Sequence, residues 1–257
     1  MLTDPQIERF SRQIILPQIG ARGQVRLLAS RVLFVHLGPA ASTTLAYLSA
    51  AGIGELGLVD EAPVSPDDVR GAPLAHCRVN VGQPRPEAAA RLAAALHPEV
   101  RTAAFADPGA ALAAGSWSLA VFGSSEAAAA CNRGIVSGRV PGLVVGDMPG
   151  HEGWLAGIAG HLPEVPCFAC ATPDLHAAAA GPPHGDGTPP EVSCLAGIMG
   201  TLTAIEAVKL ILGIGTPVLG RILTCDPDTL TTRIAPLTKD PHCPVCAAPR
   251  GSPSLPA

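Results

Sequence analysis

The amino-acid sequence predicts a doubly wound α/β protein with a mostly parallel sheet, C-terminal antiparallel strands and a structural zinc site. Residues 31–37 (RVLFVHL) form a continuous apolar run, which is typical of a central parallel strand covered on both faces. A glycine turn, a helix expected over residues 41–51 and a second strand over residues 56–60 complete a βαβ unit of about 30 residues. Two CxxC motifs, far apart in the chain, predict the zinc site.

The composition favours a core of small aliphatic side chains. Hydrophobic residues make up 47% of the 257 residues, whereas aromatic residues make up 3% and charged residues 15%. Helices packed on a parallel sheet suit such a core. The net charge of −4 gives no sign of a nucleic-acid partner or of an anionic membrane surface.

The N-terminal residues predict no secretion signal. The polar stretch MLTDPQIERFSRQ lacks a basic region followed by an apolar one, so we expect a cytoplasmic protein. The longest apolar run, residues 195–214, contains Glu206 and Lys209. We therefore expect a buried or half-buried helix there and not a membrane span.

The remaining pattern predicts one domain over residues 1–247. It begins with a helical arm, residues 1–28, and we expect a further helix over residues 85–96 and strands over 99–104, 118–122 and 143–146. Residues 153–161 are expected to pair antiparallel, 201–212 to form a helix, and 221–225 with 231–237 a hairpin. The Gly-, Pro- and Ala-rich residues 171–192 predict a flexible crossover loop, and residues 248–257 a disordered tail.

The two CxxC motifs consist of Cys167 with Cys170 and of Cys243 with Cys246. A two-residue spacing lets both thiolates of a pair reach one ion, and two pairs fill a tetrahedral zinc site with no open position. Such a closed site is structural and not catalytic. The alternatives are two unrelated surface turns or a redox pair, but each motif lies beside a proline in a turn-like segment (PCFAC, HCPVC).

Several stretches, in order along nearly the whole chain, carry a family resemblance. They are RFSRQIILPQIGARGQVRL, RVLFVHLGPAAS, YLSAAGIGELGLVD, VGQPRPEAA, EVPCFAC, GIMGTLTAIEAVKLILGIGTP and HCPVC. Together they resemble the ThiF/MoeB/HesA family of the ubiquitin-activating-enzyme-like superfamily. The resemblance implies a Rossmann-like fold and adenylylation, in which the C-terminal carboxylate of a ubiquitin-like sulfur carrier attacks the α-phosphate of ATP.

The resemblance implies where a nucleotide would bind. Gly38 and Ala41 occupy the glycine-rich turn after the first strand, and Asp60 matches the acid that contacts the ribose. Arg12, on the N-terminal arm, matches an arginine that family dimers insert into the partner's site.

Other positions depart from the family pattern. His36 replaces the first glycine of the turn, and Asp68 replaces the family's asparagine, with the neighbouring arginine displaced by one to Arg70. Arg85 replaces a lysine, which keeps the charge but not the compact ammonium group. Ser125 stands where an aspartate is expected to hold magnesium.

These substitutions favour a degenerate relative that has lost ATP and magnesium chemistry. Such a pseudoenzyme or partner subunit would still bind the C-terminus of a ubiquitin-like sulfur-carrier protein or peptide. The first alternative is an active ATP-dependent adenylyltransferase that forms an acyl-adenylate on the carrier's C-terminal glycine. The second is an NAD-dependent oxidoreductase, which is disfavoured because the loop, zinc knuckles and arm have no place in it.

The remaining expectations concern cysteines and assembly. No cysteine lies between residues 171 and 193, and we expect Cys194 to be a buried structural residue. We also predict a homodimer, or a heterodimer with a paralogue, because the arm carries apolar residues that need cover, namely Ile14, Ile15, Leu16 and Ile19.

Overall fold

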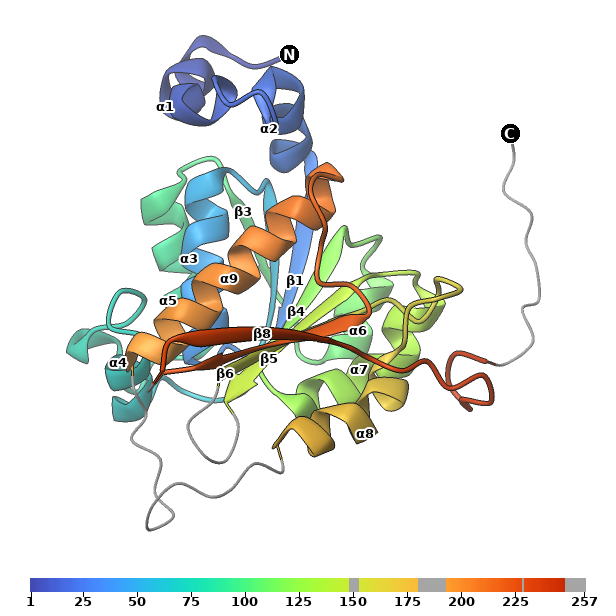
Figure 1. Cartoon of the computed structure of the whole chain (residues 1–257). Helices are drawn as coiled ribbons and strands as arrows, with labels where there is room; N and C mark the ends of the chain where they lie inside the picture. The colour runs from blue at the N-terminus through green and yellow to red at the C-terminus, as the bar shows by residue number, and fades with distance from the viewer. Residues whose placement is uncertain (148–152, 180–192, 228, 248–257) are drawn as a thin grey trace.

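The computed structural model describes residues 1–147, 153–179, 193–227 and 229–247. Its centre is an eight-stranded sheet with the strand order β3-β2-β1-β4-β5-β6-β7-β8 (Figure 1). The first five strands are parallel to one another, and β6 to β8 continue the sheet antiparallel. The predicted mostly parallel sheet with C-terminal antiparallel strands is therefore confirmed.

The strands lie close to the positions predicted from the sequence. Their bounds are β1 Arg31–Val35, β2 Glu55–Val59, β3 Arg101–Ala104, β4 Leu119–Phe122, β5 Gly142–Asp147, β6 Gly153–Ile158, β7 Arg221–Asp226 and β8 Thr231–Pro236. The last two strands pair antiparallel, as predicted for a hairpin.

The helices begin and end at recognisable signals. Their bounds are α1 Asp4–Ile14, α2 Gly20–Ala29, α3 Pro39–Ala51, α4 Pro66–Gly71, α5 Arg85–Leu96, α6 Pro108–Ala113, α7 Ser125–Ser137, α8 Phe168–Ala179 and α9 Ser193–Leu212, with a short 3₁₀ turn at Arg78–Asn80. Helix α3 is typical, because Pro39 begins it and Gly52 ends it with a positive φ of 92°.

Helices cover both faces of the sheet. Along β1, Val32 and Phe34 point to a core built with α3, α5 and α9, whereas Leu33 and Val35 point to a core built with α6, α7 and α8. This alternation is expected for a strand whose successive side chains face opposite sides. All four side chains are buried, which explains why the run reads as continuously apolar.

The arm formed by α1 and α2 packs on the end of the sheet opposite to α4 (Figure 1). Phe10 of α1 is buried against His97 in an edge-to-face contact, with ring centroids 5.7 Å apart. A side chain at Gly52 would overlap the Phe10 ring at 2.7 Å, so this glycine also permits the close approach of α1. Arg26 of α2 donates to the carbonyls of Ile211 and Leu212, each at 2.7 Å, and so caps the end of α9.

His97 makes this contact sensitive to acid. Burial is the main cause that lowers the pKa of His97; Arg9 on α1 lowers it further, and Glu99 opposes the shift. A histidine whose folded pKa lies below its unfolded value, about 6.5, contributes stability that is complete above that pH and is lost as the pH falls.

We therefore expect the wild-type protein to lose stability more steeply than a His97→Phe variant as the pH falls below about 6.5. Denaturant unfolding at several pH values measures the difference, and His242→Phe at an exposed histidine is the control. Parallel pH profiles for wild type and His97→Phe would contradict the assignment.

The structure corrects the prediction of a flexible loop over residues 171–192. Residues 171–179 belong to α8, and residues 180–192 lie outside the described part of the chain. Phe168, Ala171 and Leu175 are buried in one core at helical spacing, although Pro173 lies inside the helix. Burial of this apolar face outweighs the helix-breaking tendency of the proline. The predicted tail, residues 248–257, also lies outside the described residues.

Helix α9 begins earlier than predicted and ends at Leu212, followed by Gly213 with a φ of 65°. Its stretch Cys194–Leu212 is the one helix in the described residues that is long and apolar enough to cross a membrane. Because 56% of its most apolar window is buried against the rest of the fold, this is weak evidence for a membrane span. The structure agrees with the expected half-buried helix.

Candidate functional site

The candidate site lies at the carboxyl ends of β1, β2 and β4, where α3 begins. His36 follows β1 with a φ of 65°, the left-handed conformation that glycine adopts most easily. If Gly123, the residue after β4, carried a Cβ atom, that atom would lie 3.1 Å from His36 Nδ1. A Cβ atom at Gly38 would lie 3.4 Å from the same nitrogen. The imidazole therefore fills the space between the two glycine turns, and its Nδ1 is buried without a hydrogen-bond partner in the described residues.

Asp60 follows β2 and holds the turn between β1 and α3. Its Oδ2 accepts from the backbone N–H of Leu37 at 2.6 Å, and its Oδ1 accepts from that of Ala62 at 2.8 Å. The carboxylate therefore already binds two backbone groups at the position expected to contact a ribose.

Arg85, at the start of α5, joins Asp60 to Asp68 on α4. Its Nη1 lies 3.3 Å from Asp60 Oδ2, and its Nη2 lies 3.0 Å from both carboxylate oxygens of Asp68. The side chains of Arg85, Asp60 and Asp68 are 13%, 4% and 3% exposed. One buried cation is thus shared between two buried carboxylates, which we call the Arg85 cluster.

Asp68 is also fixed by α4 itself. The backbone N–H and hydroxyl of Ser65 donate to its Oδ2 at 2.7 and 2.9 Å, while Asp68 N–H donates to the Ser65 hydroxyl. This reciprocal capping of the helix N-terminus locks the carboxylate in the orientation that meets Arg85.

Two buried polar residues that the sequence analysis did not identify extend the cluster towards α3. His76 Nε2 lies 3.2 Å from the Ser42 hydroxyl, which donates to the carbonyl of Leu37 at 3.0 Å. Burial lowers the pKa of His76; Asp68 opposes this shift and Arg85 adds to it. The histidine is therefore neutral at pH 7 and contributes no further cation. The sequence around His76 contains no motif from which its contact with Ser42 could have been predicted.

Other predicted site residues are not brought into the cluster. Arg70 is 67% exposed and pairs with Asp67 on the surface of α4. Ser125 begins α7 at the same edge of the sheet, where the neighbouring Ser124 caps the helix. Ala41 is fully buried in α3, whereas Arg12 lies on α1, at the opposite end of the sheet (Figure 1).

The four predicted metal ligands converge on one point. The sulfur atoms of Cys167, Cys170, Cys243 and Cys246 all lie within 4.8 Å of one another. The sulfur–sulfur distances are 3.8 Å for Cys167–Cys170, 3.7 Å for Cys167–Cys243 and 3.5 Å for Cys170–Cys246. Tetrahedral zinc with bonds of about 2.3 Å separates neighbouring sulfurs by roughly 3.8 Å, so the donor set fits zinc.

The environment of the sulfurs also favours metal binding. Burial raises the pKa of Cys243, but hydrogen bonds from the N–H groups of Cys246 and Val245, together with those from the Cys170 and Cys167 thiols, lower it to about 7. Burial raises the pKa of Cys170 in the same cluster. A lowered pKa favours the thiolate form of Cys243, which is the form that binds a metal ion.

Cys194 does not fulfil its predicted role as a buried structural residue, because it is exposed at the start of α9. Helix starts leave the first turn partly uncovered, and the core-facing positions of α9 begin at Leu195. Cys131, in contrast, is buried in α7, and burial raises the pKa of its thiol to about 11.

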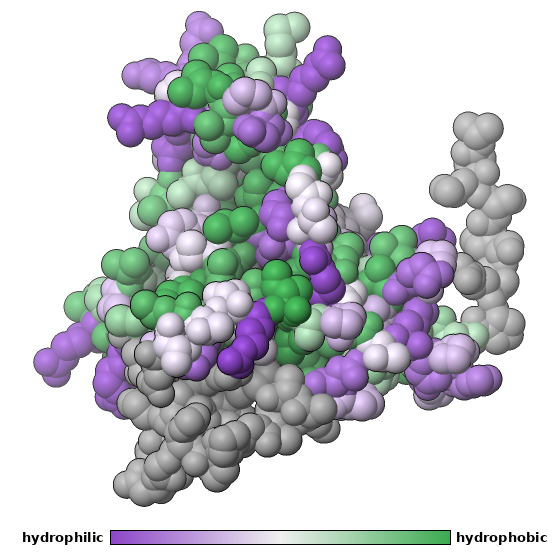
Figure 2. Space-filling view, in the orientation of Figure 1, coloured by the Kyte–Doolittle hydropathy of each residue, from purple (hydrophilic) through white to green (hydrophobic). Residues whose placement is uncertain are grey.

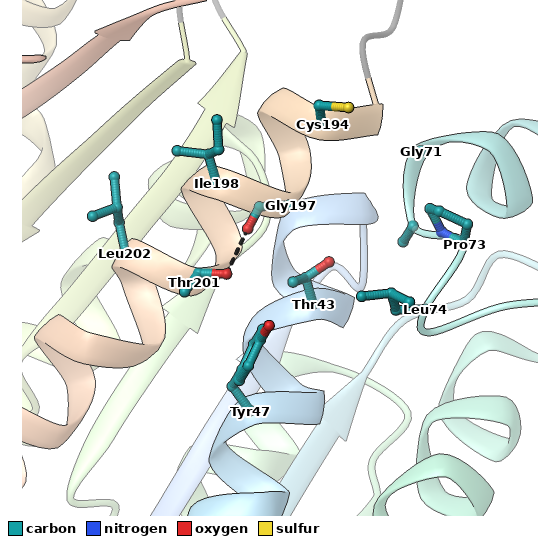
Figure 3. A pocket seen from close by; sticks show the side chains of 11 residues that line it. Thr43, Tyr47, Gly71, Pro73, Leu74, Cys194, Gly197, Ile198, Thr201 and Leu202 are labelled. Carbon is teal, nitrogen blue, oxygen red and sulfur yellow. Dashed lines mark hydrogen bonds between the residues drawn. The ribbon is translucent and has the colours of Figure 1, made fainter. Parts of the chain in front are cut away.

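A hollow of about 490 Å³ lies beside Cys194, between α3, the segment after α4, and α9. Figure 3 shows Tyr47, Leu74 and Ile198 around it, and all three are exposed apolar side chains. The hollow is distinct from the Arg85 cluster, since none of the three cluster residues lines it.

Comparison with known proteins places the chain in a family. The model of the ThiF family matches residues 10–131. The SAMP-activating enzyme E1 of Haloferax volcanii is 32% identical over 250 residues, covering 94% of this chain and 89% of the relative. The chain therefore belongs to the ThiF family.

Other relatives and a solved structure agree. The sulfur carrier protein adenylyltransferase of Thermus thermophilus is 30% identical, with 95% of this chain and 92% of the relative covered. The molybdopterin-synthase adenylyltransferase of Escherichia coli is 31% identical, with 95% and 98% covered. The crystal structure of E. coli MccB with ATP shares the fold, with a TM-score of 0.75, 18% identity, and 93% and 74% coverage.

Proposed function

We propose that this chain is an E1-like protein of the sulfur-carrier adenylyltransferase class with a weakened nucleotide site. It binds the C-terminal segment of a ubiquitin-like sulfur-carrier protein or peptide at the carboxyl edge of its sheet. A relative named a sulfur carrier protein adenylyltransferase and one named a SAMP-activating enzyme E1 match 95% and 94% of this chain, which supports the class. The Arg85 cluster is the observation that supports the weakened site.

A nucleotide site needs free cations and hydrogen-bond donors to hold phosphates. Arg85 is a largely buried cation that reaches the β1–α3 turn through Asp60, and Asp60 and Asp68 already neutralise it. Turning Arg85 towards a phosphate would leave a buried carboxylate unpaired, at a cost of about 3–5 kcal/mol. That cost corresponds to roughly two to four orders of magnitude in affinity.

Two further substitutions are also expected to weaken nucleotide binding. The His36 ring fills the space between Gly38 and Gly123, where a glycine would leave room for a ligand close to the backbone. Ser125 offers a hydroxyl where a carboxylate would hold magnesium, and magnesium prefers carboxylate and phosphate oxygens.

An active adenylyltransferase is the second candidate. It is favoured by one observation, namely that relatives named adenylyltransferases are matched over 92% and 98% of their length. The two candidates differ in nucleotide affinity, which separates them directly.

We expect wild-type protein to bind magnesium-ATP about two to four orders of magnitude more weakly than a triple variant, Asp68→Asn, Arg85→Lys and Ser125→Asp. The variant frees a compact cation and adds a metal ligand. Isothermal calorimetry measures the affinity, and pyrophosphate release with candidate carriers measures the chemistry. Arg91→Lys, the same change on the exposed face of α5, is the control.

Micromolar ATP binding and carrier-dependent pyrophosphate release by the wild type would overturn the weakened site and support the active enzyme. Carrier binding without pyrophosphate release, together with gain of ATP binding only in the triple variant, supports the proposal.

A further expectation concerns assembly. Hydrophobic side chains gather on the arm in Figure 2, and Ile7, Ile15, Leu16 and Val25 are exposed there. We expect a homodimer, or a heterodimer with a paralogue, that covers this surface and inserts Arg12 into the partner's site.

Light scattering of the purified chain is expected to give a dimeric mass, and Ile15→Glu to give a monomer. Leu230→Glu is the control, because Leu230 is 75% exposed and Ile15 76%. A wild-type chain that stays monomeric at tens of micromolar, both alone and with paralogues, would rule the interface out.

A further inference from the structure

Asn132 is a buried polar side chain that joins helix α7 to the cysteine cluster. It is 4% exposed. Its Oδ1 accepts from the backbone N–H of Phe168 at 3.0 Å, and its Nδ2 lies 3.5 Å from the sulfur of Cys167. The bond from Phe168 fixes the orientation of the amide, because only the oxygen can accept it. The NH₂ group therefore points at the sulfur.

We propose that Asn132 is the residue that positions Cys167 and stabilises its thiolate in the zinc centre, through an N–H···S hydrogen bond. The inference rests on zinc binding by the four cysteines. Four thiolates around one Zn²⁺ carry a net charge of −2, and this charge lies in a buried site. Donors that point at the sulfurs spread that charge, whereas an unpaired charge of this kind is costly away from water.

The contact is selective for Cys167. Cys167 is the most buried of the four cysteines, at 0% exposed against 6% for Cys170 and 3% for Cys243, and Cys246 is half-buried. A buried thiolate depends on protein donors, and the Asn132 amide is a side-chain donor aimed at it. The same amide oxygen holds Phe168, the residue next to Cys167, so that one side chain fixes both the ligand and its backbone.

Asn132 also connects the metal centre to the carboxyl edge of the sheet. Helix α7 begins at Ser125, beside the end of β4, and carries Asn132 two turns further on. Asn132 therefore links α7 to the cysteine cluster through two hydrogen bonds, to Cys167 and to Phe168. This role belongs to a positioning residue and not to a catalytic one.

The test compares two variants with wild type. Asn132→Asp keeps an acceptor for the Phe168 N–H but removes the donor to sulfur, and Asn132→Leu removes both. We expect both variants to bind zinc about 10–100-fold more weakly, measured by competition with a chromophoric chelator. Zinc content of the wild type is measured first, since a metal-free wild type would refute zinc binding itself.

Lys239→Met is the matched control. Lys239 donates to the carbonyls of Gly160, Leu162 and Val165, at 3.2, 2.6 and 2.8 Å, and so holds the same region without touching a sulfur. It is expected to lower thermal stability but to change zinc affinity far less than Asn132→Asp does. Weak zinc binding in Asn132→Leu alone, with normal binding in Asn132→Asp, would show that packing or the Phe168 contact matters and would overturn the proposal.

A measurement on the wild-type sequence avoids variants that fail to fold. In protein loaded with ¹¹³Cd, the side-chain amide protons of Asn132 are expected to show scalar coupling to the metal through the sulfur. Coupling confined to backbone N–H groups, with none to the Asn132 amide, would refute the N–H···S bond.

Discussion

Cys170→Ser is expected to release the zinc and to lower the melting temperature by roughly 6–20 °C. Structural zinc contributes folding free energy directly, and losing one of four thiolates leaves three ligands in a buried site. A loss of about 3–5 kcal/mol corresponds to roughly 6–20 °C in a protein of this size. Metal analysis and calorimetric melting measure the two effects on the same sample.

Cys77→Ser is the control, because Cys77 is an exposed cysteine outside the cluster. It is expected to keep one zinc per chain and a wild-type melting temperature. A metal-free Cys170→Ser protein that melts like wild type would show that the four cysteines do not form a structural zinc site.

Arg85→Met is expected to destabilise the fold by about 3–5 kcal/mol, because it leaves Asp60 and Asp68 buried without their cation. Methionine keeps much of the volume of the side chain, so the loss reports the charge and not a cavity. Denaturant unfolding gives the free energy. Arg91→Met, on the exposed face of the same helix, is expected to change stability by less than about 0.5 kcal/mol.

A second substitution distinguishes charge from packing. In the Arg85→Met background, Asp68→Asn removes one uncompensated carboxylate and is expected to recover part of the lost stability. If the double variant is as unstable as the sum of the two single variants, the three residues do not act as a cluster.

The parts of the fold that depend on local pattern could be predicted from sequence. Strand β1 reads as a strand because both of its faces are buried, and α5 was predicted with the bounds Arg85–Leu96 that the structure shows. The clustering of the four cysteines could be predicted because a CxxC spacing is itself a geometric constraint. Each of these signals lies within one short stretch of chain.

The Arg85 cluster could not be predicted in this way. Arg85 lies 17 residues from Asp68 and 25 from Asp60 along the chain. The three side chains come into contact only because the first turn of α4 packs beside the start of α5. Helix α8 was missed for a related reason, since Pro173 and the neighbouring glycines and prolines indicate a loop. Only the core beneath Phe168 and Leu175 makes the helix favourable.

The separation of the two cysteine pairs along the chain has a consequence for biosynthesis. Cys170 and Cys246 are 76 residues apart, and the last β-hairpin and Lys239 lie between them. A nascent or truncated chain that ends before Cys243 has only one CxxC pair and cannot enclose the ion. We therefore expect metal capture to be among the last events of assembly, so that retained zinc would distinguish a chain that carries its final hairpin from one that does not.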